Sequence, residues 1–332
     1  MKALQCVELG GPDKLQINEI EAPKVIPGHV VIDVKSGSIN FPDVLMIQGL
    51  YQFQPPMPFT PGGESAGVVS EVGEGVSKFK VGDKVFAMTG VGAFAEKILA
   101  AEASCMTIPD SMDFDSAAAL SMTYGTSLYA LKQRANLQAG ETLLVLGASG
   151  GVGLATIELG KAMGAKVIAA ASTQDKIDMC MAHGADEGFI YPSGDLDRDQ
   201  QKELSSKIKE LTGGVGANVV YDPIGDCYSE PCIRATAWDG RYLVIGFAAG
   251  EIPKIPINLA LLKGMKIVGV FWGAWVGMNP KENKSNFQEL FNLHTEGKIN
   301  PEVSDSFTLE NGASAIAHLK DRKAKGKVII TM

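Results

Sequence analysis

Several features that mark other classes of protein are missing from this chain of 332 residues. It has no cluster of lysine and arginine, and a formal net charge of -8 gives no attraction to nucleic acid or to an anionic membrane surface. Its longest apolar run, residues 267–278, contains three glycines and is shorter than the ~20 residues that span a bilayer. Near the N-terminus, the acidic Glu8 comes before any apolar stretch long enough to form the core of a signal peptide. We therefore expect neither a nucleic-acid nor a membrane partner.

Cysteine and histidine are also scarce. The five cysteines are scattered without a CxxC pair, which argues against a disulfide framework and predicts a reducing, cytoplasmic location. The four histidines form no HxxxH or Cys/His cluster, so each is expected at the surface or at a helix end. A GxSxG elbow, a YxxxK pair and a Gly-Lys-Ser/Thr phosphate loop are absent too, which argues against serine hydrolase, short-chain dehydrogenase and P-loop chemistry.

Glycine, in contrast, is abundant, with 38 residues spread through loops between apolar runs. The first third reads as short β-segments, among them residues 30–34, 64–72 and 84–87, interrupted by dense proline and glycine. From about residue 115, strands and helices alternate. Continuous apolar strands between helices predict an α/β domain with a doubly wound parallel sheet. The strands are expected at 143–146, 166–170, 218–221 and 242–245, and the helices at 151–163, 175–182 and 202–211.

A glycine-rich turn joins the first of these strands to the first helix. Dinucleotide folds use glycine here because the backbone must approach a pyrophosphate at the start of the helix. Ala148 replaces the first glycine of the GxGxxG pattern, whereas Gly150 and Gly153 are in register. The strand–turn–helix context favours a nucleotide over an empty tight turn. The predicted contact residues are Ala148, Ser149, Gly150, Gly151, Val152 and Gly153.

The end of the second strand, at Ser172 and Thr173, has no acid for the ribose hydroxyls of NAD. Asp175 comes slightly late, and the neighbouring Lys176 is a cation able to pair with a 2′-phosphate. Lys176 is equally compatible with a solvated lysine in the first turn of the helix. These residues alone therefore leave the choice between NADP and NAD open.

Four segments carry a resemblance to a known family. They are residues 58–67 (PFTPGGESAG), 81–85 (VGDKV), 92–96 (GAFAE) and the glycine turn. In this order they resemble the zinc-independent quinone oxidoreductases of the medium-chain dehydrogenase/reductase superfamily, over essentially the whole chain. The resemblance implies a GroES-like, mainly β catalytic domain from residues 1–122 and 268–332. It also implies a Rossmann NADPH-binding domain from residues 123–267, with the active site in the cleft between them.

The resemblance also assigns roles to single residues. Members that use NADPH hold its phosphate with a lysine, a tyrosine and an arginine, which match Lys176, Tyr191 and Arg322. Asn40 and Asp43 match positions of the nicotinamide or substrate pocket. Together with the glycine turn, the remaining cofactor-binding residues are expected to be Thr126, Ser172, Phe247, Phe271 and Trp272, although Phe247 and Trp272 are equally compatible with ordinary core aromatics.

No zinc is expected. Zinc alcohol dehydrogenases of the superfamily use an early cysteine, a histidine within Gly-His-Glu and a later cysteine or acid. This chain has Gly63 at the histidine position, no cysteine in the early loop and no four-cysteine lobe. Without a Lewis acid, the expected substrate accepts hydride unaided, as quinones and α,β-unsaturated carbonyl compounds do.

Residues 40–51 also resemble the corresponding loop of medium-chain enoyl-thioester reductases, where a tyrosine at the position of Tyr51 helps to donate a proton. Packing of Tyr51 on the proline-rich loop is an equal alternative. We predict an NADPH-dependent, metal-free reductase of a small electrophilic quinone or enone, with Tyr51, Asn40 and Asp43 as catalytic residues. Its rivals are an enoyl-thioester reductase and a non-catalytic NADPH-binding protein. A homodimer is expected through residues 267–271, because an exposed apolar edge strand would otherwise aggregate.

Overall fold

The computed structural model describes all 332 residues, which divide into two compact units. One unit comprises Met1–Met122 and Pro301–Met332, and the other comprises Thr123–Asn300. Residues 268–300, which the family resemblance assigns to the catalytic domain, cluster with the second unit. They do so because the helix at Pro280–Thr295 is tied to the second unit through Lys132, which donates to Glu289 at 2.6 Å.

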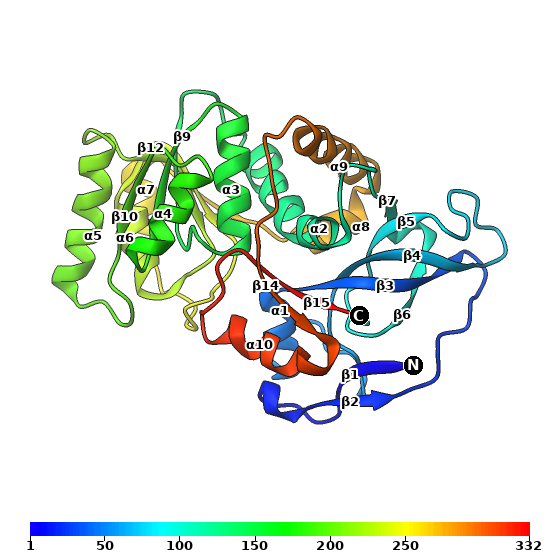
Figure 1. Ribbon diagram of the computed structural model, residues 1–332. Coiled ribbons are helices and arrows are strands. Elements are labelled where there is room, and N and C mark those ends of the chain that lie inside the picture. Colours follow the sequence, from blue (N-terminus) through cyan, green and yellow to red (C-terminus); the bar gives the residue numbers. More distant parts are fainter. The chain divides into compact units, whose positions relative to one another are not determined.

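The first unit is mainly β and contains both chain termini (Figure 1). Its main sheet runs in the order β14-β15-β3-β4-β5-β7, with β6 paired to β3, and β1 and β2 form a separate antiparallel pair. Two short helices, α1 and α10, pack against each other. The elements are β1 Lys2–Cys6, β2 Leu15–Glu19, β3 His29–Ile39, α1 Phe41–Ile47, β4 Glu64–Val72, β5 Lys84–Met88, β6 Lys97–Ala101, β7 Cys105–Thr107, β14 Val303–Thr308, α10 Gly312–Lys320 and β15 Lys327–Thr331.

The long strand β3 organises this unit. Its alternating Val30, Ile32 and Val34 side chains are buried in one hydrophobic core, as expected for a strand that covers a core with one face. Its last residues pair with β15 on one side and β4 on the other. The last strand of the chain therefore lies beside the end of β3, where helix α1 begins.

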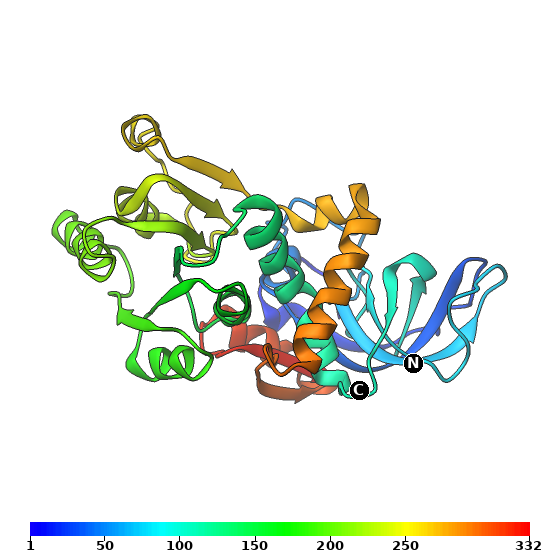
Figure 2. The same cartoon turned by 90° about the horizontal axis from the view of Figure 1, so that it is seen from above.

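The second unit has a six-stranded parallel sheet in the order β10-β9-β8-β11-β12-β13. Figure 2 shows helices on both of its faces, with α3 and α4 on one and α5, α6 and α7 on the other. This confirms the predicted doubly wound sheet. The elements are β8 Thr142–Val145, α3 Gly151–Ala162, β9 Lys166–Ala171, α4 Gln174–Ala182, β10 Glu187–Ile190, α5 Arg198–Leu211, β11 Ala217–Asp222, α6 Ser229–Arg234, β12 Thr236–Val244, α7 Asn258–Lys263, β13 Lys266–Gly269, α8 Trp272–Met278 and α9 Pro280–Thr295.

Helix α2 (Phe114–Leu128) continues into a π-helical turn at Tyr129–Arg134. The strands of the parallel sheet are apolar on both sides because helices cover both faces: Leu143, Leu144 and Val145 are fully buried. No helix combines the length and the apolar character that crossing a membrane requires.

Candidate functional site

The glycine turn lies where β8 ends and α3 begins. Gly147 has φ +55°, in the left-handed region that glycine adopts without strain. Helix α3 begins after Gly150, whose backbone is extended, and its first N–H groups have no acceptor inside the helix. Strand β8 borders β11, and the strand order reverses between these two. A helix N-terminus at this point of an open parallel sheet suits an anionic ligand such as a pyrophosphate.

Two glycines of the turn have different tasks. A Cβ on Gly153 would lie 2.5 Å from the carbonyl oxygens of both Gly147 and Ala148, so only glycine allows α3 to pack this closely on the turn. A Cβ on Gly150 would meet just one atom, the Gly147 oxygen at 3.4 Å. Gly150 therefore leaves space at the helix N-terminus. Ser149 is buried in the same turn, and Gly151 and Val152 are half-buried at the start of α3.

Lys176 lies at the carboxyl end of β9, in the first turns of α4. Its ammonium is half-buried and lies 3.5 Å from the Ser172 hydroxyl. The exposed Thr173 hydroxyl donates to the Asp175 carboxylate, so that acid already has a local partner. A cation and hydroxyl groups thus gather where the ribose of a dinucleotide is bound in this class of fold.

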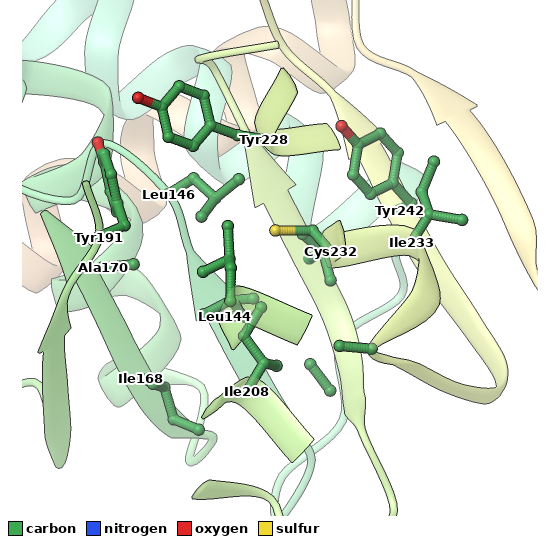
Figure 3. Close-up of a cluster of buried hydrophobic side chains, with 14 of the residues drawn as sticks. Leu144, Leu146, Ile168, Ala170, Tyr191, Ile208, Tyr228, Cys232, Ile233 and Tyr242 are labelled. Carbon is green, nitrogen blue, oxygen red and sulfur yellow. The ribbon is translucent and has the colours of Figure 1, made fainter. Parts of the chain in front are cut away.

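Tyr191 follows β10 and belongs to the core rather than to the surface. It is 7% exposed, and its ring lies 5.0 Å from that of Tyr228, with 59° between the ring planes. Burial raises the pKa of the Tyr191 hydroxyl, which also accepts from the backbone N–H of Gly147. Figure 3 shows Tyr191, Tyr228 and Tyr242 with their hydroxyl oxygens at the same end of the sheet. Tyr191 therefore remains a neutral group beside the glycine turn.

Asp222, the last residue of β11, anchors the loops at this end of the sheet. Its carboxylate is 1% exposed and accepts from the N–H groups of Ile224 (2.7 Å) and Gly225 (2.9 Å) and from the Tyr242 and Ser229 hydroxyls. Its backbone oxygen accepts from Ile245, after β12. Burial raises the pKa of the Asp222 carboxyl. The network thereby fixes the loops after β11 and β12.

The expected aromatic residues occupy different environments. Phe247 is half-buried and packs on Gly225, where a Cβ would lie 2.7 Å from the ring. Trp272 is 7% exposed and packs on Gly125, next to the half-buried Thr126, and its indole N–H is buried without a hydrogen-bond partner. Phe271 is 59% exposed. The unpaired Trp272 indole N–H beside Thr126 could donate to a polar group of a bound ligand. No contact of Phe271 indicates a ligand.

In the first unit, the structure brings Asn40 and Asp43 together at the start of α1. The Asp43 carboxylate is fully buried and accepts from the backbone N–H groups of Asn40 (2.8 Å) and Gly62 (3.1 Å). Burial raises its pKa to about 7, although both hydrogen bonds favour the charged form. Asp43 thus titrates near neutrality, as acid–base groups in active sites often do.

Beneath Asn40 lies a buried ion pair between Lys327 of β15 and Glu64 of β4, 3.1 Å apart. The ammonium also donates to the Asn40 side-chain oxygen at 2.7 Å and to the Ile39 carbonyl at 2.9 Å. The carboxylate accepts from the Asn40 amide at 2.6 Å, from the Met122 N–H at 2.6 Å and from the Ser121 hydroxyl. Both oxygens of the Glu64 carboxylate therefore accept two hydrogen bonds each.

Tyr51 and Arg322 also belong to the first unit. Tyr51 is half-buried after α1, and both burial and the neighbouring Asp43 charge raise the pKa of its hydroxyl. Arg322 is exposed in the turn after α10, with φ +60°, and its N–H donates to the Leu319 carbonyl at 3.0 Å. Tyr51 thus lies close enough to Asp43 to be affected by its charge, whereas Arg322 belongs to a separate surface turn.

Comparison with known proteins agrees with this two-unit architecture. A model of the alcohol dehydrogenase GroES-like domain matches residues 26–110, and a model of the zinc-binding dehydrogenase family matches residues 151–293. Quinone oxidoreductase of Rattus norvegicus is 31% identical over 336 residues, which cover 100% of this chain and 98% of the relative. The chain belongs to the quinone oxidoreductase family.

Other members of the quinone oxidoreductase family are similarly close. The quinone oxidoreductase-like protein 2 of Rattus norvegicus is 36% identical over 332 residues, covering 100% of this chain and 92% of the relative. The solved structure of Escherichia coli quinone oxidoreductase complexed with NADPH has a TM-score of 0.90 at 27% identity, with 100% of both chains covered. The predicted family and fold class, a GroES-like unit with a Rossmann unit, are confirmed.

One matching family model is described as zinc-binding, and the residues of this chain can be compared with the ligands that zinc requires. Zinc in proteins takes about four thiolate, imidazole or carboxylate ligands. Here no three histidine, cysteine, aspartate or glutamate side chains come together as a metal site. Glu64 is already saturated by donors that include an ammonium. A cation would have to displace Lys327 from this carboxylate.

Sequence reasoning missed three residues of these clusters: Lys327, Ser121 and Asp222. Lys327 follows Gly326 and precedes an apolar run, and a lysine at that position is expected to lie exposed at the end of a strand. Its partner is 263 positions away, so no local spacing reveals the pair. Asp222 carried a weak signal, because an acid directly after an apolar parallel strand lies at the ligand-binding edge of such a sheet.

Proposed function

We propose that this chain is an NADPH-dependent, metal-free oxidoreductase that reduces a quinone or an α,β-unsaturated carbonyl compound. The observation that carries the proposal is the glycine turn at the strand-order reversal, with unpaired N–H groups at the start of α3 and Lys176 at the next strand end. Relatives named quinone oxidoreductase, one of them solved with NADPH, support the same cofactor and acceptor class.

On the cofactor side, we assign the pyrophosphate to the turn at residues 147–153 and the 2′-phosphate to Lys176. The neutral Tyr191 hydroxyl, next to Gly147, is the second donor of this group. The unpaired indole N–H of Trp272 supports a polar contact near Thr126. We retain in this proposal the cofactor-binding roles that the family resemblance gives to Ser172, Phe247, Phe271 and Arg322.

On the acceptor side, Tyr51, Asn40 and Asp43 are the proposed catalytic residues. Bound NADPH supplies a hydride. A quinone or enone that takes it develops negative charge on oxygen, which needs a hydrogen-bond donor and then a proton. The Tyr51 hydroxyl is protonated at neutral pH, because burial and Asp43 both raise its pKa. Tyr51 therefore holds a proton that it can donate. The buried Asp43 carboxylate accepts from the N–H of Gly62, which follows the segment that carries Tyr51.

We also propose a homodimer through β13, the last strand of the parallel sheet. Ile267 on this strand is 40% exposed, and exposed apolar side chains surround it in sequence, with Leu261 at 80% and Phe271 at 59%. An edge strand with unpaired backbone groups and apolar side chains favours pairing with another chain. Pairing with a second copy would cover both.

The function is tested by following NADPH oxidation with simple quinones, small enones and a crotonyl thioester, each with and without a chelator. Turnover of quinones or enones that the chelator leaves unchanged is the expected result, with no stoichiometric zinc by elemental analysis. Preference for the crotonyl thioester would replace the proposal by an enoyl-thioester reductase. Tight NADPH binding without turnover of any acceptor would indicate a binding protein, and equimolar zinc lost together with activity would overturn the metal-free mechanism.

A further inference from the structure

The Lys327 ammonium is buried in an environment that only polar contacts can stabilise. Its side chain is 5% exposed, and its three acceptors are the Glu64 carboxylate, the Asn40 side-chain oxygen and the Ile39 carbonyl. A buried ammonium with three well-placed acceptors is fully satisfied, whereas loss of one charged partner leaves the other charge stranded. The ion pair joins the last strand of the chain to β4 and to the end of β3.

The same ion pair determines how the Asn40 amide is oriented. Its oxygen accepts from the Lys327 ammonium at 2.7 Å, and its NH₂ group donates to the Glu64 carboxylate at 2.6 Å. A flipped amide would put NH₂ against the ammonium and oxygen against the carboxylate. Both contacts would be repulsive, so the opposite charges select a single orientation.

From Asn40 the contacts continue into helix α1. The Asn40 N–H donates to the Asp43 carboxylate, and the other oxygen of this carboxylate accepts from Gly62. Glu64 is itself fixed by the Ser121 hydroxyl and the Met122 N–H of α2. Lys327 therefore acts at the start of helix α1, where two of the proposed catalytic residues lie, although it belongs to strand β15.

We propose that Lys327 is a positioning residue: through its contacts with Glu64 and the Asn40 side chain, it holds Asn40 and the start of helix α1 in the geometry used for reduction of the acceptor. This inference rests on the proposed function. Stability alone does not explain the pair, because apolar side chains of similar volume often stabilise a core as well as a buried ion pair does. Fixing one amide orientation is what a charge pair adds.

The experiment compares Lys327→Met with the charge-neutral double variant Glu64→Gln/Lys327→Met. The acceptor is whichever quinone or enone the wild type turns over, and kcat, KM, NADPH affinity and urea unfolding are measured. The double variant leaves no stranded charge, so it tests function even where Lys327→Met alone does not fold. Lys2→Met is the matched control, because Lys2 forms an exposed ion pair with Glu310 in the same unit.

We expect kcat to fall roughly 10- to 100-fold in both Lys327 variants, because small misplacements of reacting groups lower the rate by such factors. NADPH affinity and the Lys2→Met control should stay at wild-type values, and the double variant should regain stability but not kcat. A second measurement adds Lys327→Met to an Asn40→Ala background. There it should lower kcat no further, because the residue it acts through is gone.

Two results would overturn the inference while leaving the proposed function intact: wild-type kcat in the folded double variant, or an undiminished effect of Lys327→Met in the Asn40→Ala background. A wild type that reduces no quinone or enone would instead overturn the proposed function and this inference together. Failure of the two ideas is therefore distinguishable.

Discussion

The Lys327 ammonium lies 3.1 Å from the Glu64 carboxylate, although the two residues are 263 positions apart in the chain. Their side chains are 5% and 1% exposed, so the pair is almost completely removed from water. Removing one partner of such a pair typically costs about 3–5 kcal/mol, because a buried charge remains unpaired. Strand β15 therefore supplies the buried charge that holds the Asn40 side chain at the start of helix α1.

The buried Asp43 carboxyl should make the folded state lose stability as the pH rises. Its pKa is about 7 in the folded protein, above the ordinary value of 3.8. Between these two values the folded protein holds a proton that the unfolded chain has released. The stabilisation that the protonated Asp43 carboxyl gives the folded state is therefore fully present below about pH 4. This stabilisation, on the order of 4 kcal/mol, is lost by about pH 7.

Asp43→Asn isolates this effect. The amide accepts less well from the two N–H groups, a cost that does not change with pH. Urea unfolding between pH 4.5 and 8 should therefore show the variant gaining stability relative to wild type as the pH rises. A difference between the two proteins that is independent of pH would mean that Asp43 does not titrate in this range.

Tyr51→Phe should leave NADPH binding intact and slow the reduction of enones more than that of quinones. A reduced quinone takes its protons on oxygen, directly from water, whereas protonation of carbon benefits from a placed acid, typically by 10²- to 10⁴-fold. Steady-state kinetics with one quinone and one enone give the comparison. Tyr129→Phe is a control, since Tyr129 stacks on Trp275 in the second unit. Small and equal effects on both substrates would assign Tyr51 to packing alone.

The parallel sheet could be predicted from the sequence because its signal is local. Buried strands such as β8 and β9 are continuous apolar runs, and the glycine turn between β8 and α3 stands at a fixed spacing. The Glu64–Lys327 pair has no such signal, because its register comes from β15 pairing with β3. The attachment of helix α9 to the second unit has no local signal either: much of the helix is polar in sequence, and it is held by hydrogen bonds with Lys132 and Gln133 and by packing of Phe287 on Trp272.

A single charge on the exposed edge strand should separate the proposed dimer. Ile267→Asp puts a carboxylate on β13, where pairing with a second copy would bury it without a partner. Light scattering at micromolar concentration should give a dimer for wild type and a monomer for the variant. Val215→Asp is the control, because Val215 is 71% exposed in a loop of the same unit. A monomeric wild type, or a variant that remains dimeric, would count against pairing through β13.

Lys176→Ala should weaken NADPH binding and leave NADH binding nearly unchanged. A charge-assisted hydrogen bond to a phosphate contributes about 1.5–3 kcal/mol, which corresponds to roughly 10- to 100-fold in affinity. NADH has no 2′-phosphate, so it cannot form this hydrogen bond and is not affected by its loss. Fluorescence titration of both cofactors measures the two affinities, and Lys202→Ala, an exposed lysine paired with Asp199 on α5, is the matched control. Asp175 offers the competing outcome, because its carboxylate can accept from a ribose hydroxyl and so favour NADH. The sign of the difference therefore decides: equal weakening of both cofactors, or a wild type that prefers NADH, would remove the 2′-phosphate from Lys176.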